Sequence, residues 1–167
     1  AALGIPMVGV DPSLVLCYRD EYVKALGPAR GDFQVLLPQE WLLSLPAPQV
    51  SAAAKEPGEA EPWYLFAHCT EKTAKPTTHG DWSTLFGRFG ARLQPVSVGC
   101  CGMAGTYGHD AKQVENSKGI YGLSWAEPLE RLPKARCLAT GYSCRSQVKR
   151  MEGEKLKHPL QALLELL

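Results

Sequence analysis

Short apolar segments alternate with helical segments along most of this chain, and this alternation restricts its fold more than any other feature. Apolar segments with the length of buried strands lie at 5–10, 35–37, 63–68, 92–98 and 136–140. Apolar spacing and capping residues predict helices at 14–26, 38–45, 78–89, 111–125, 144–151 and 160–167. Strands that alternate with helices form parallel sheets. We therefore predict an α/β fold, with a largely parallel sheet and helices on both of its faces.

The segment 46–62 differs in composition from its neighbours. It is rich in Pro, Ala, Glu and Ser, and its apolar residues show no periodicity. We predict a loop or linker there, between the two halves of one domain that covers 1–167. The sequence does not start with Met, and its first residues lack the basic region and cleavage site of a signal peptide. We expect it to be the C-terminal piece of a longer protein.

The balance of charges argues against a nucleic-acid partner. The 18 Lys and Arg residues nearly cancel the 17 Asp and Glu residues, and no basic run is long enough to follow a phosphate backbone. No apolar stretch approaches the length of about 18 residues that spans a membrane. Six cysteines are too few for a small disulfide scaffold. We expect reduced thiols and a cytoplasmic location, with a peripheral position at the inner face of the membrane left open.

Four of the cysteines follow the ends of predicted strands. Cys69 follows the strand at 63–68, Cys100 and Cys101 follow the strand at 92–98, and Cys144 lies just past the strand at 136–140. The carboxyl ends of parallel strands lie along one edge of a sheet, so thiols that are distant in sequence should meet there. Four thiolates suit an iron–sulfur cluster or zinc. The sequence therefore predicts one metal site built from these four residues.

The other cysteines and two histidines have alternative roles. His68 precedes Cys69 and His109 closes the loop after the cysteine pair, so each is a candidate ligand, a residue that orients a ligand, or a structural histidine. Cys17 lies on a predicted helix and Cys137 lies within a predicted strand, and both are expected in the core. A buried free cysteine also behaves as a small apolar residue, which is the alternative for the four predicted ligands.

Three short motifs carry a resemblance to a known family. They are His68-Cys69, Gly99-Cys100-Cys101-Gly102 and Gly141-Tyr-Ser-Cys144. These motifs resemble the cysteine-rich CCG domain that occurs in heterodisulfide reductase, in anaerobic glycerol-3-phosphate dehydrogenase and in the iron–sulfur subunit of glycolate oxidase. Together with the segments 100–109, 139–147 and 158–161, they look like the C-terminal end of large bacterial FAD-linked oxidases similar to D-lactate and D-2-hydroxyglutarate dehydrogenases.

The chain departs from the family pattern at two places. The family carries two cysteine-rich repeats, and the first one here looks degenerate, since Pro12-Ser13-Leu14 stands where many members have Pro-Ser-Cys. Many members also end with Cys-x-x-Cys, and Gly141 stands at the first of those cysteines. The resemblance thus implies a pseudo-repeated domain with a single cysteine site.

The resemblance also implies a function. It implies an electron-transfer domain with a 4Fe–4S-type cluster held by Cys69, Cys100, Cys101 and Cys144. FAD would lie in the parent chain outside this sequence, and the partners would be an FAD domain and a ferredoxin-like segment. The fragment alone would not be an enzyme. Two alternatives stay open: a zinc-binding or metal-free docking module, and dithiol–disulfide chemistry of Cys100 and Cys101.

Overall fold

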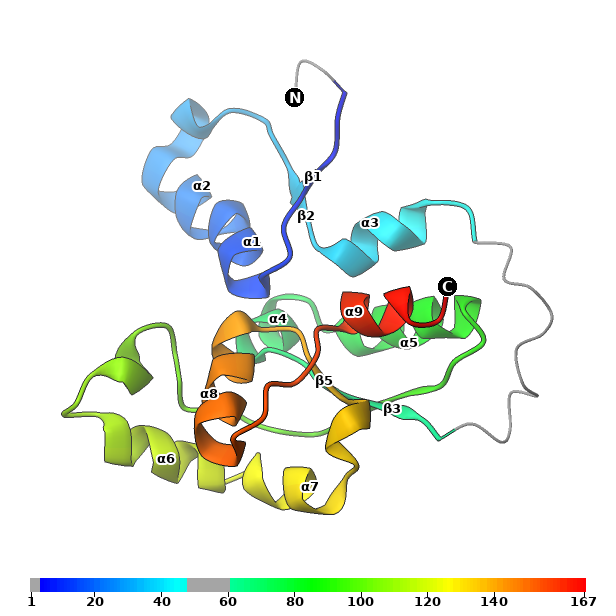
Figure 1. Cartoon of the computed structure of the whole chain (residues 1–167). Coiled ribbons are helices and arrows are strands. Elements are labelled where there is room, and N and C mark those ends of the chain that lie inside the picture. The colour runs from blue at the N-terminus through cyan, green and yellow to red at the C-terminus, as the bar shows by residue number, and fades with distance from the viewer. Residues whose placement is uncertain (1–3, 48–60) are drawn as a thin grey trace.

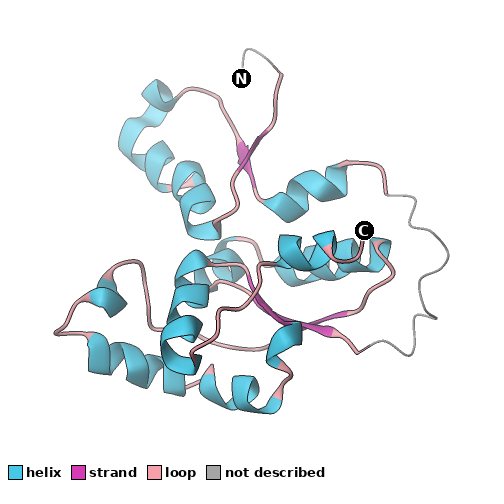
Figure 2. Ribbon diagram, viewed as in Figure 1, coloured by secondary structure: helices cyan, strands magenta, loops and turns pink. Residues whose placement is uncertain are grey.

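The computed structural model describes residues 4–47 and 61–167, so most of the predicted linker at 46–62 lies outside the described residues. Within them the chain has an α/β fold, which confirms the predicted class (Figures 1 and 2). The described strands form two parallel sheets rather than one. In the smaller sheet, β1 (Met7–Val8) pairs with β2 (Val35–Leu36). In the larger sheet, β3 (Trp63–Phe66) lies between β4 (Leu93–Pro95) and β5 (Cys137–Ala139).

Helices connect these strands and account for most of the remaining described residues. The α-helices are α1 (Pro12–Arg19), α2 (Glu21–Leu26), α3 (Pro38–Ser44), α4 (Cys69–Ala74), α5 (Thr78–Arg88), α6 (Val114–Gly122), α7 (Ala126–Arg131), α8 (Tyr142–Glu152) and α9 (Pro159–Leu164). Short 3₁₀ turns lie at Gly27–Arg30, Tyr107–His109 and Lys134–Arg136.

Helices cover both faces of the larger sheet at β3 and β5, as predicted, whereas Gln94 and Pro95 of the edge strand β4 are exposed. Successive side chains of a strand point to opposite faces, and β3 uses this alternation to join two apolar clusters. Leu65 packs with residues of α5 and α9, whereas Phe66 packs with residues of α6, α7 and α8. Phe66 also contacts Trp125, with ring centroids 5.1 Å apart. Burial on both faces explains why this strand reads as a continuous apolar run in the sequence.

Several predicted boundaries are wrong, for local reasons. The helix predicted at 14–26 is two helices, because the backbone is distorted at Asp20 (φ −115°, ψ −69°), which ends α1 and begins α2. The helix predicted at 111–125 is the shorter α6, and the apolar pattern did not indicate the separate helix α7 after it. Of the strand predicted at 92–98, Leu93–Pro95 form β4, and the flanking Arg92 and Val96 also make backbone hydrogen bonds with β3. The residues after Val96 leave the sheet and lead to the cysteine pair.

Candidate functional site

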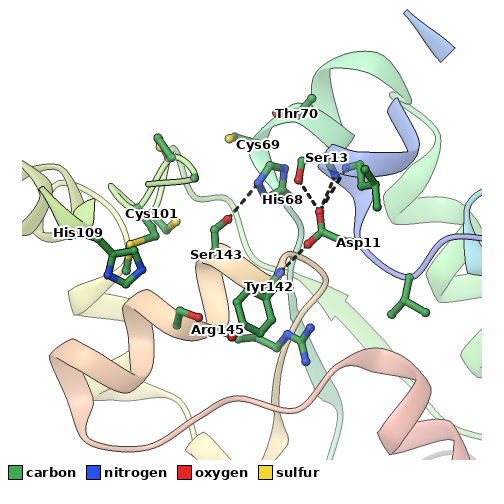
Figure 3. A pocket seen from close by; sticks show the side chains of 17 residues that line it. Asp11, Ser13, His68, Cys69, Thr70, Cys101, His109, Tyr142, Ser143 and Arg145 are labelled. Atoms are coloured by element: carbon green, nitrogen blue, oxygen red, sulfur yellow. Dashed lines mark hydrogen bonds between the residues drawn. The ribbon is translucent and has the colours of Figure 1, made fainter. Parts of the chain in front are cut away.

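The three strands of the larger sheet deliver four cysteines to one region of the molecule. Cys69 begins α4 directly after β3, Cys144 lies in the first turn of α8 after β5, and Cys100 and Cys101 follow β4. The strands are parallel and in register, with Leu65 opposite both Pro95 and Leu138. Their carboxyl ends therefore lie side by side. Figure 3 shows Cys69 and Cys101 facing the same hollow.

The four thiols lie close enough to influence one another's ionisation. Charge on Cys69 or on Cys101 acts to raise the pKa of Cys100 and the pKa of Cys144. All six cysteines of the chain are free thiols. Cys100 is therefore close to Cys69, a residue distant in sequence, as well as to its neighbour Cys101.

Cys101 is the thiol of this group whose pKa is lowered. The hydrogen bond from Cys144, helped by the backbone N–H groups of Met103 and Ala104, outweighs burial and lowers the pKa of Cys101 to about 7. The same hydrogen bond, together with burial, raises the pKa of Cys144. Burial raises the pKa of Cys100. The lowered pKa favours the thiolate of Cys101, and the thiolate is the form that binds metals.

The turn after the cysteine pair depends on glycine. Gly102 has a φ of 85°, and a Cβ added there would lie 2.2 Å from the backbone oxygen of Ser117. Ala104 also has a positive φ, of 40°. Successive N–H groups in such a turn form a concave backbone site for an anion. This conformation explains why two backbone donors reach Cys101.

The chain before the cysteine pair is held from both sides. Lys72 of α4 donates a hydrogen bond to the backbone oxygen of Val98. The Ser124 hydroxyl accepts from the N–H of Gly99 at 2.9 Å, and the Trp125 indole donates to the Gly99 oxygen at 3.1 Å. These contacts come from α4 and from the connection between α6 and α7, so the position of the pair depends on both faces of the sheet.

His68 lies between the thiols and the N-terminus of α8. Its side chain is 7% exposed, and burial lowers its pKa, which favours the neutral ring. Nε2 is 3.4 Å from the Ser143 hydroxyl, whereas the buried Nδ1 has no hydrogen-bond partner among the described residues (Figure 3). A Cβ at Gly141 would lie 2.4 Å from the His68 ring and 3.1 Å from the Cys144 sulfur. Glycine at 141 therefore makes room for both side chains.

A cavity of ≈ 730 Å³ opens onto this group of residues. Cys69, Cys100 and Cys101 line it, as do both candidate histidines, His68 and the exposed His109. Its other polar walls were not predicted from the sequence, and they are Asp11, Ser13, Thr70, Tyr142, Ser143, Arg145 and Ser146.

Asp11 belongs to this site although it lies in the other half of the chain. Its carboxylate caps α1 and also accepts the N–H of Tyr142 at 2.9 Å, at the start of α8 (Figure 3). Burial acts to raise the Asp11 pKa, but the hydrogen bonds from Ser13, Tyr142 and Leu14 prevail and lower it. The one available signal was that Asp11 follows the first strand, as Cys69 follows the third.

The two remaining cysteines lie outside the group. Cys137 is 1% exposed within the core, as predicted, and burial raises its pKa to about 12. Cys17 was also expected in the core, but this is wrong: it is half-buried on α1 and belongs to none of the apolar clusters among the described residues. Because both lie apart from the four grouped thiols, substitutions at these two cysteines can serve as controls in tests of metal binding.

The donor chemistry of the site suits a soft metal, and its present geometry is open. Four thiols, one of them with a lowered pKa, and a neutral imidazole are donors typical of zinc and iron–sulfur centres. In the part of the chain that the structure describes, no group of three or more His, Cys, Asp or Glu side chains is arranged to hold a metal ion. None of the described helices is long and apolar enough to cross a membrane.

Comparison with known proteins gives close relatives of this chain. It is 63% identical over its whole length to a D-2-hydroxyglutarate dehydrogenase of Pantoea ananatis and 62% identical to one of Escherichia coli. It is 52% identical to one of Haemophilus influenzae. The chain spans only 16% of the length of the first two and 17% of the third. No protein-family model matches the chain, and no solved structure matches it.

Proposed function

We propose that this chain is the electron-transfer part of a D-2-hydroxyglutarate dehydrogenase, and that its grouped thiols hold an iron–sulfur cluster of the 4Fe–4S type. The observation that carries the proposal is the meeting of Cys69, Cys100, Cys101 and Cys144 from three strand ends. Relatives that are 48–63% identical over nearly the whole chain bear the dehydrogenase name. Cysteine thiolates are the usual protein ligands of such clusters.

Each grouped residue has a distinct task in this proposal. A cluster of this kind supplies reversible one-electron transfer when bound. Cys101, whose pKa is lowered, and Cys144 would both hold the cluster as thiolates, so binding of the cluster would be accompanied by loss of thiol protons. Gly102 and Gly141 leave the space that the sulfur atoms need. The buried, neutral His68 adjusts the polarity beside the cluster, while His109 stands at the solvent side.

The substrate chemistry belongs to other parts of the protein in this proposal. Oxidation of a 2-hydroxyacid to a 2-oxoacid releases two electrons and two protons, and FAD in the parent chain would accept them. The present chain would then pass single electrons onward, with the FAD domain and a ferredoxin-like segment as its partners. On this view the chain alone does not oxidise the hydroxyacid, and the parent protein works in the cytoplasm.

Anaerobic reconstitution with ferrous iron and sulfide tests the proposal. We expect about four iron atoms and four sulfides per chain, with broad visible absorbance. A double variant, Cys100→Ser with Cys101→Ser, should lose this iron. Cys17→Ser is the matched control, because Cys17 lies apart from the grouped thiols, and it should retain the iron. Equal iron content in the double variant and the control would contradict the proposal.

Zinc is the second candidate occupant, because cysteine sulfur and a neutral imidazole, such as that of His68, are also its preferred donors. The domain would then organise its neighbours rather than carry electrons. Elemental analysis of protein prepared without air separates the two: stoichiometric zinc without sulfide supports the docking role, and iron with sulfide supports electron transfer. A chain with neither metal after reconstitution contradicts both.

A further inference from the structure

The strand β1 is unusually exposed for part of a sheet. Met7 and Val8 are 38% and 36% exposed, and the flanking Ile5 and Val10 are 68% and 50% exposed. Two strands rarely form a stable sheet by themselves in water. An apolar strand with one open edge is also a template for pairing with another strand.

The hydrogen-bond ladder shows which backbone groups of β1 have no partner among residues 4–47 and 61–167. Gly9 donates to the Leu36 oxygen at 3.0 Å, and Met7 and Val8 lie opposite Val35 and Leu36. In a parallel ladder alternate residues face the same neighbour. Met7 and Gly9 therefore face β2, and the N–H and C=O of Val8 point away from it, toward the outer edge of β1.

The outer edge of β2 is closed, in contrast. Val35 faces that edge, and its oxygen accepts a hydrogen bond from the Arg19 side chain at 2.7 Å. Glu40 holds Arg19 in place through an ion pair. An apolar groove of ≈ 580 Å³ lies beside β1 and is lined by Met7, Val8, Gly9, Leu14, Tyr18, Phe33 and Val35. The open edge and the open groove thus belong to the same strand.

The region around β5 and α9 has the same local arrangement as the region around β1, β2 and α3, with one additional strand. Ala139 of β5 donates to the Lys157 oxygen at 3.0 Å, as Gly9 donates to Leu36. Each acceptor is followed by a helix that starts with Pro: α9 follows Lys157, and α3 follows Leu36. In both helices the side chain of the third residue accepts a hydrogen bond from the N–H of the cap residue. In the β5 region, the edge of β5 that faces away from Lys157 is paired with β3. The two strands are parallel, and Leu65 lies opposite Leu138.

We propose that β1 pairs in the whole protein with one more parallel strand, an apolar counterpart of β3, supplied by polypeptide outside these 167 residues. Val8 would take the place that Leu138 has in β5. The relatives have ample polypeptide for this, since the chain covers 16% of their length. A second copy of the chain fits poorly, because two β1 strands related by a two-fold axis would run antiparallel.

Hydrogen–deuterium exchange on the full-length polypeptide that contains this chain tests the proposal. Amides in the peptide over 5–10 should exchange at least ~100-fold more slowly than unpaired amides, at rates similar to those of β3. The protection should not change on dilution. Val8→Pro removes the outward-facing donor and should abolish it, whereas Val8→Thr keeps both the amide and the β-branched shape and should retain it.

Three outcomes overturn the proposal. Fast exchange over 5–10 in the unmodified full-length polypeptide means that no strand covers β1. Protection that disappears on dilution means that a second copy is the occupant. Equal protection in Val8→Pro and Val8→Thr means that the outward amide is not paired. Iron content plays no part in this test, so its result is independent of the proposed function.

Discussion

Glu71 is a fully buried carboxylate that joins four elements behind the cysteine site. One oxygen accepts hydrogen bonds from Gln39 at 2.9 Å, from Thr78 at 2.5 Å and from Trp82 at 3.4 Å. The other accepts from the Thr140 hydroxyl at 2.5 Å, and the same hydroxyl accepts the N–H of His68 at 2.9 Å. Through this chain of bonds, Glu71 connects α3, α4 and α5 to the loop that follows β5.

Glu71→Gln changes one of these bonds and leaves the volume of the side chain almost unchanged. The amide oxygen can serve the first three donors, but the amide NH₂ then faces the Thr140 hydroxyl. The Thr140 hydroxyl then has no carboxylate oxygen to which it can donate its proton. It cannot compensate by accepting from the new NH₂ group without competition, because it already accepts the N–H of His68. Hydrogen bonds to charged groups contribute about 1.5–3 kcal/mol. Because the variant also relieves the burial of a charge, we expect a net loss of about 2 kcal/mol in the free energy of unfolding.

Urea unfolding followed by tryptophan fluorescence measures this loss. With a dependence on urea of about 2 kcal/mol per molar, the midpoint should fall by about 1 M. Glu115→Gln is the matched control, because Glu115 is 84% exposed on α6, and its effect should stay within about 0.5 kcal/mol. If Glu71→Gln also stays within about 0.5 kcal/mol, the network does not stabilise the fold and our reasoning fails.

Two further predictions concern packing and pH. Gly141→Ala places a Cβ 2.4 Å from the His68 ring and should destabilise the fold by about 1–3 kcal/mol in urea unfolding. Gly119→Ala on α6 meets no atom within 4 Å and should be neutral or slightly stabilising; equal effects of the two would contradict the steric argument. Burial lowers the pKa of His158 from 6.5 to about 4, so stability should fall by roughly 3 kcal/mol as pH drops through that window. His158→Asn keeps a cap for α9 and should flatten this part of the stability profile; an unchanged profile would exclude His158 as its cause.

The sequence predicted the architecture well where a segment is buried on both faces. The apolar run at 63–68 corresponds to β3, the central strand, and the cysteines after each strand of the larger sheet do come together. Predictions were weaker where one residue changes the local geometry. Asp20 divides the first predicted helix, and the Lys72 contact with Val98 shows that the segment before Cys100 is held by a side chain rather than by strand pairing.

The sequence by itself determined the fold class and the positions of four cysteines after strand ends, because apolar periodicity and strand-end positions are local properties of the chain. Only the tertiary structure decided that three of these cysteines line one cavity, that the pKa of Cys101 is lowered, and that Asp11 reaches α8 from the other half of the chain. It alone also showed that β1 keeps an open edge while β2 does not. These features depend on distances between segments far apart in sequence, and such distances are established only when the elements pack.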